Sequence, residues 1–119
     1  MKGKGWHECS TPSKRGCWLS NGTYEYNIHT NYEADAPTGI TRRYTLDVSN
    51  KTLAPDGWFN RDGKVFNQSY PGPWIKACWG DTIEVTVKNH LRYNGTTVHW
   101  HGIRQLGTME ADGVNGVTQ

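Results

Sequence analysis

Long apolar runs, one-sided charge and helical periodicity are all missing from this chain of 119 residues. Hydrophobic residues make up only 34% of it, and no apolar run is long enough to span a bilayer. The first residues, Met1-Lys2-Gly3-Lys4-Gly5, lack the apolar centre of a signal peptide. We therefore expect neither a membrane span nor an export signal within these residues.

Strong charge is missing as well. The formal net charge is +2, and the 13 Lys and Arg residues are scattered along the chain. Domains that bind nucleic acids gather their basic residues on one face or along one segment. We therefore expect no nucleic-acid partner.

Cysteine is scarce, with three residues in the chain. Cys9 and Cys17 flank a short polar loop, and a disulfide between them would stabilise the fold by roughly 2–3 kcal/mol. The alternatives are a reduced pair, or a zinc site that His7 completes. Cys78 lies next to Trp79, where we expect a small buried thiol.

Alternation of apolar and polar residues is what the chain does have. Residues 41–48 place Tyr44, Leu46 and Val48 on one face of a predicted strand. Residues 82–88 alternate most regularly, with Ile83, Val85 and Val87 inward. Residues 1–30 show no clear period, so we expect an irregular arm there.

Two turn signals add predicted hairpins. Asp62-Gly63 separates the aromatic runs 57–60 and 64–67, and Asn94-Gly95 leads into a predicted strand over residues 96–103. Short strands with turn residues between them indicate an all-β fold, either a β-sandwich or a Greek-key barrel.

The predicted strand 96–103 carries His99-Trp100-His101. Side chains alternate along a strand, so both imidazoles point to one face and Trp100 to the other. Two nitrogen ligands on one face are half of a metal site, although most such pairs are surface histidines without a metal. Trp100 then packs in the core, with an electron conduit as the alternative.

Asp112 follows a short loop later and can orient an imidazole or pass protons. The alternative is an ordinary loop Asp before Gly113, in a left-handed turn. His7, His29 and His90 are interpreted as non-ligands because nothing near them has ligand spacing.

The order His99-Trp100-His101-Gly102, Gln105, Asp112-Gly113 resembles the first copper-binding motif of multicopper oxidases. Other segments, in the same order, are similar to the N-terminal cupredoxin domain of ascomycete laccases, and together they span most of the chain. They are Asn31-Tyr32-Glu33, Thr41-Arg42-Arg43-Tyr44, Phe66-Asn67, Tyr70-Pro71-Gly72-Pro73, Trp79-Gly80-Asp81-Thr82 and Asn115-Gly116-Val117-Thr118. Trp74 departs from the family, which usually has a small polar residue there.

The resemblance implies a cupredoxin-like Greek-key β-sandwich or barrel that is incomplete, with residues 1–30 as an arm and residues 31–119 as a partial first domain. In the family, a histidine in the position of His99 binds the type 2 copper and one in the position of His101 binds a type 3 copper. A carboxylate in the position of Asp112 assists proton delivery. The family also has a cysteine pair near the mature N-terminus, which supports the Cys9–Cys17 disulfide.

The family oxidises phenolic reductants at a type 1 copper and reduces dioxygen to water at a trinuclear cluster. That cluster takes four His-x-His motifs, shared between the first and third domains. Only one motif is present, so we expect a chain truncated before the second motif. The remaining cupredoxin domains of the same polypeptide would be its partners, and the chain alone would be inactive.

Two other functions stay open from the sequence. One is a stand-alone copper- or zinc-binding module, with His90 as a third ligand, and the other is a secreted carbohydrate-binding module with aromatic platforms. Other multicopper oxidases, such as ascorbate or metal oxidases, share the motif.

Four glycosylation acceptors, Asn21, Asn50, Asn67 and Asn94, fall where we expect turns or strand ends. They favour a secreted glycoprotein.

Overall fold

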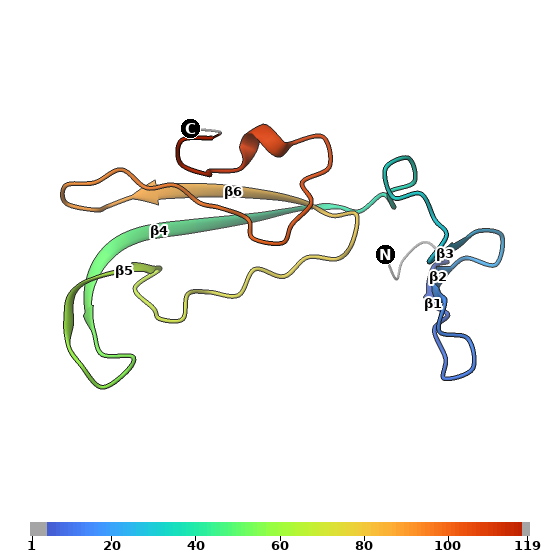
Figure 1. Cartoon of the computed structure of the whole chain (residues 1–119), viewed down its shortest axis with the longest axis horizontal. Coiled ribbons are helices and arrows are strands. Elements are labelled where there is room, and N and C mark those ends of the chain that lie inside the picture. Colours follow the sequence, from blue (N-terminus) through green and yellow to red (C-terminus); the bar gives the residue numbers. More distant parts are fainter. Residues whose placement is uncertain (1–4, 118–119) are drawn as a thin grey trace. The chain divides into compact units, whose positions relative to one another are not determined.

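The computed structural model describes residues 5–117, whose regular structure is almost entirely β-strand. These residues divide into two compact units, one of residues 5–41 with 77–82 and one of residues 42–76 with 83–117. The first holds an antiparallel sheet in the order β1-β2-β3, and the second sheet has the order β5-β4-β6 (Figure 1). The predicted all-β class is confirmed. The elements are β1 (His7–Glu8), β2 (Cys17–Ser20), β3 (Glu25–Asn27), β4 (Thr41–Leu53), β5 (Asn60–Phe66), β6 (Thr82–Asn89) and a short 3-10 helix, η1 (Met109–Ala111).

The expected irregular arm instead contains the small β1-β2-β3 sheet. His7 of β1 pairs with Ser20 of β2, and Cys17 of β2 pairs with Asn27 of β3. The Cys9–Cys17 disulfide is present, with the two Cα atoms 5.4 Å apart, so both thiols are used and the zinc alternative is wrong. Strands of two to four residues are too short for alternation to be visible in a sequence.

Aromatic rings fill the interior of this first unit. Tyr26 is only 7% exposed, and its ring lies 5.2 Å from Trp6 and 4.8 Å from Trp79 between centroids. Trp18 stacks on Tyr32, whose ring also reaches Trp79. Many aromatic side chains of this unit therefore pack against one another.

In the second sheet, β4 is the central strand. It pairs antiparallel with β5, where Val48 faces Phe66 and Ser49 faces Val65. Its other neighbour, β6, runs parallel to it, because the amides of Thr82 and His90 donate to the carbonyls of Ile40 and Val48 at the same residue offset.

The core of the second sheet follows the predicted alternation. Leu46, Val48 and Val65 are each less than 5% exposed. Along β6 the side chains of Ile83, Val85 and Val87 are half-buried, while those between them are exposed. The two strongest strand predictions are confirmed, and β4 continues beyond its predicted end to Leu53.

The predicted hairpin at Asp62-Gly63 is wrong, because both residues lie inside β5. The chain turns earlier, where the amide of Gly57 donates to Ala54 and Gly57 has a φ of 92°. A Cβ on Gly63 would lie 2.5 Å from a methyl of Leu53, so this glycine provides space within the strand.

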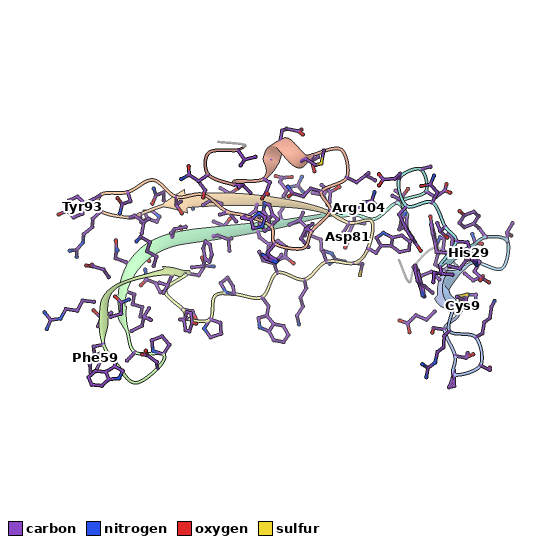
Figure 2. The ribbon with its side chains drawn as sticks, in the orientation of Figure 1. Cys9, His29, Phe59, Asp81, Tyr93 and Arg104 are labelled. Atoms are coloured by element: carbon purple, nitrogen blue, oxygen red, sulfur yellow. A yellow bond between two sulfur atoms is a disulfide. The ribbon has the colours of Figure 1, made fainter. Side chains whose placement is uncertain are left out.

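The hairpin predicted at Asn94-Gly95 and the strand over residues 96–103 are also not formed. Gly95 has no positive φ, and residues 94–100 belong to no strand. Figure 2 shows Tyr93 at the tip of the loop after β6, where its ring is 92% exposed. In Figure 1 residues 90–117 are drawn as coil apart from η1.

Two further predictions for single residues have different outcomes. Cys78 is exposed, so the prediction of a buried thiol is wrong. Cys78 lies in a tight turn, where its backbone amide donates to the carboxylate of Asp81. Trp74 is 78% exposed, with the ammonium of Lys76 at 4.8 Å from its ring centre.

The four glycosylation acceptors differ in their surroundings. Asn21 and Asn94 are exposed in loops, but Asn50 is half-buried within β4 opposite Lys64, contrary to the expected turn or strand end. The side chain of Asn67 bonds to the backbone of β4, accepting from the amide of Asp47 at 2.7 Å. No helix within residues 5–117 has the length and apolar character needed to cross a membrane.

Candidate metal centre

The His-x-His segment is a stretch of chain outside any strand, closed by a turn. The amide of Ile103 donates to the carbonyl of Trp100 at 3.0 Å, and Gly102 has a φ of 75°. This is the conformation that glycine favours at the third position of a type II turn. Gly102 thus ends the motif with a reversal of the chain.

The two imidazoles lie side by side. Their ring centroids are 5.5 Å apart and their planes meet at 72°, in an edge-to-face contact. Both residues are exposed. The prediction that His99 and His101 share one side is confirmed, although no strand pairing holds them there.

Asp112 binds two neighbouring residues of the motif at once. Its Oδ2 lies 2.8 Å from Nδ1 of His99, and its Oδ1 accepts the backbone N–H of Trp100 at 3.0 Å. The Asp112 side chain is 15% exposed, against 49% for His99. The carboxylate therefore lies beneath the imidazole and holds both its ring and the adjacent backbone.

The same contacts govern the charge of Asp112. The backbone N–H of Trp100 lowers the pKa of the Asp112 carboxyl, and the hydrogen bond from His99 acts in the same direction, while partial burial opposes both. An ionised carboxylate has no proton to donate, so Nδ1 of His99 carries the hydrogen. That leaves Nε2 of His99 as the nitrogen that can bind a metal.

The loop that returns Asp112 to the motif is tightly turned. Gln105 has a φ of 48°, and its carbonyl accepts the amide of Thr108. After η1, the amide of Gly113 donates to the carbonyl of Val98 at 3.0 Å. Gly113 has no positive φ, so the alternative of a left-handed Asp-Gly turn is wrong.

Trp100 is half-buried, and its contribution to the site is its backbone N–H. The sequence did not predict this hydrogen bond or the Val98–Gly113 contact, because most backbone contacts do not depend on residue type. The glycine after Asp112 was the one signal, since only glycine leaves room for so close an approach.

The remaining described histidines lie outside the pair. Nε2 of His90 is 3.1 Å from Oδ1 of Asp47, and His7 lies in β1. His29 follows β3, where its amide donates to Asn27. Across residues 5–117 no group of three or more His, Cys, Asp or Glu side chains gathers in a way that could hold a metal ion. The described part of the chain therefore offers two adjacent imidazoles and no third ligand.

A family model described as "Multicopper oxidase" matches residues 47–119, which include the whole site. The chain belongs to the multicopper oxidase family. It is 52% identical over 114 residues to a laccase from Cryphonectria parasitica and 50% identical over 111 residues to Laccase-2 of Botryotinia fuckeliana. These alignments cover 93% and 92% of the chain, but only 19% and 18% of the two relatives.

Comparison with solved structures also identifies laccases as similar proteins. The crystal structure of the laccase from Botrytis aclada matches with a TM-score of 0.72 and 51% identity, over 88% of this chain and 18% of the laccase. This multicopper oxidase chain thus has the predicted cupredoxin-like fold. It spans about a fifth of the length of the relatives it matches, and membership of the family implies copper as the metal.

Proposed function

We propose that this chain is the part of a laccase-like multicopper oxidase that supplies His99 and His101 as copper ligands. The observation that carries the proposal is the contact of His99 with Asp112 beside His101, inside the region that matches the family. The parent protein would oxidise phenolic reductants one electron at a time and reduce dioxygen to water.

The donor set fits copper. Neutral imidazole binds copper in both redox states, and the Asp112 carboxylate fixes Nδ1–H so that Nε2 of His99 remains for the metal. By their place in the motif, His99 is assigned to the type 2 copper and His101 to a type 3 copper. When bound, copper would supply the one-electron redox chemistry.

Asp112 has two roles in this proposal. It orients His99 through Oδ2 and the Trp100 backbone through Oδ1. As an ionised carboxylate touching a ligand ring, it also assists proton delivery during dioxygen reduction. The orienting role rests on the contacts described above, and the proton role on the resemblance.

Two imidazoles do not complete a trinuclear site. We propose that the other ligands, and the type 1 copper, belong to further cupredoxin domains of the same polypeptide. The relatives, about five times longer than this chain, support this. The stand-alone metal module gains no support, because residues 5–117 gather no third ligand, and the comparisons favour the oxidase over a carbohydrate-binding module.

We also propose that the parent is secreted and glycosylated. The Cys9–Cys17 disulfide suits an oxidising compartment, and the acceptors Asn21 and Asn94 are exposed.

Titration of the 119-residue chain with Cu(II), followed by electron paramagnetic resonance, tests the ligand assignment. We expect weak binding with nitrogen hyperfine structure that His99→Ala and His101→Ala each reduce, because each leaves a single imidazole. His90→Ala is the matched control, because His90 pairs with Asp47 outside the motif. An unchanged nitrogen signal in both motif variants would contradict the assignment.

A further inference from the structure

Gly113 occupies a position with no room for a side chain. It is buried, and a Cβ built on it would lie 2.7 Å from both the backbone nitrogen and the backbone oxygen of Val98. Both atoms belong to the main chain, so no side-chain rotation relieves the overlap. Because Gly113 has no positive φ, the need for glycine here is one of space alone.

The contact joins the two segments that form the candidate site. Val98 directly precedes His99, and Gly113 directly follows Asp112. The amide of Gly113 donates to the carbonyl of Val98 at 3.0 Å, one residue away from the Asp112–His99 bond. The backbone pair thus fixes the distance at which the carboxylate meets the imidazole.

We propose that Gly113 is a positioning residue that sets the tautomer of His99. Close approach of Gly113 to Val98 brings Asp112 within 2.8 Å of Nδ1 of His99 and within 3.0 Å of the Trp100 amide. Any side chain at position 113 displaces the loop, both bonds lengthen, and hydrogen bonds weaken with distance. His99 then loses the acceptor that keeps its hydrogen on Nδ1.

The tautomer of His99 decides which of its ring nitrogens can bind a metal. With the hydrogen on Nδ1 the ring presents Nε2, and with the other tautomer it presents Nδ1 instead. This inference rests on the proposed copper role of His99 for its functional meaning. The tautomer itself is a property of the metal-free chain.

The test is a long-range proton–nitrogen correlation spectrum of the metal-free, 15N-labelled chain at about pH 8, where an ordinary histidine is neutral. We expect His99 as a single Nδ1–H form in the unsubstituted chain. Gly113→Ala should give a mixture of the two tautomers. Gly95→Ala is the matched control, because Gly95 has open space around its Cβ position and no positive φ, and it should leave His99 unchanged.

Folding is checked in the same sample by the His90 signals of this spectrum and by a one-bond proton–nitrogen spectrum of the β4 and β6 amides, neither of which should change. A folded Gly113→Ala chain that keeps the single Nδ1–H form would overturn the proposal.

If Gly113→Ala does not fold, two other measurements decide. Asp112→Ala should abolish the single tautomer. In the unsubstituted chain, urea should remove two properties at the same concentration: the protection of the Gly113 amide from hydrogen exchange and the single tautomer of His99. Loss of the two at different urea concentrations would overturn the proposal. Copper binding enters none of these spectra, so a failed copper titration and a failed tautomer experiment remain distinguishable.

Discussion

At the scale of single residues, the proposed copper role of His99 depends on its contact with Asp112. The ring keeps its hydrogen on the nitrogen that faces the carboxylate, and Trp100 contributes a backbone donor to the same carboxylate. Removing a residue that orients a metal ligand commonly lowers the affinity for the metal. The residue-scale prediction therefore concerns Asp112.

Asp112→Ala should lower the affinity of the chain for Cu(II) by about 10- to 100-fold, because His99 loses both its orientation and its fixed tautomer. Isothermal titration measures the effect. Asp47→Ala is the control, since Asp47 pairs with His90 away from the motif. Equal affinities for Asp112→Ala and the unsubstituted chain would show that the carboxylate does not orient the ligand.

At the scale of elements, the sequence predicted the long alternating strands. It did not predict the backbone contacts between segments that are far apart in the chain. The alternation of apolar and polar residues around Leu46 and Val85 predicts β4 and β6, because one face of each strand is shielded from water. The hairpin predicted at Asp62-Gly63 is wrong because the pairing of β5 with β4 outweighs the local preference of Asp-Gly for a turn. The sequence pattern predicted His99, His101 and Asp112 as candidate site residues, which the structure places side by side, but it did not predict the Val98–Gly113 contact that joins their two segments.

Gly63→Ala should destabilise the second sheet by about 1–3 kcal/mol, because the added methyl meets Leu53 and the carbonyl of Lys51 within the β4–β5 pairing. The free energy of unfolding in urea measures this. Gly95→Ala, in open space, should change it by less than about 0.5 kcal/mol. Similar values for the two variants would contradict the packing described for β5.

Replacing Cys9 and Cys17 together by Ser should lower the free energy of unfolding by about 2–3 kcal/mol, the value expected for a short closed loop. Urea unfolding of the chain, followed by tryptophan fluorescence, measures the loss. Cys78→Ser provides the comparison, since that thiol is exposed and outside the disulfide. A double variant as stable as Cys78→Ser would show that the disulfide contributes nothing.

At the scale of the whole molecule, the proposed function makes this chain one part of a shared site. Its described residues gather two imidazoles and no third ligand, and its relatives are about five times longer. The function assigned to the parent therefore requires ligands that these residues do not contain.

The 119-residue chain alone, loaded with copper, should not oxidise a phenol with uptake of dioxygen. An oxygen electrode measures this directly, with the laccase from Botrytis aclada as the positive control. Turnover by the isolated chain would show that a complete oxidase site forms without further domains.

The most direct test places this chain in the laccase from Botrytis aclada, in exchange for the segment that it matches at 51% identity. Oxygen uptake with a phenol is then compared among the chimera, its His99→Ala variant and its His90→Ala control. We predict uptake by the chimera and by the His90→Ala control, and none by the His99→Ala variant. Equal uptake by the chimera and its His99→Ala variant would contradict the assignment of His99 as a copper ligand.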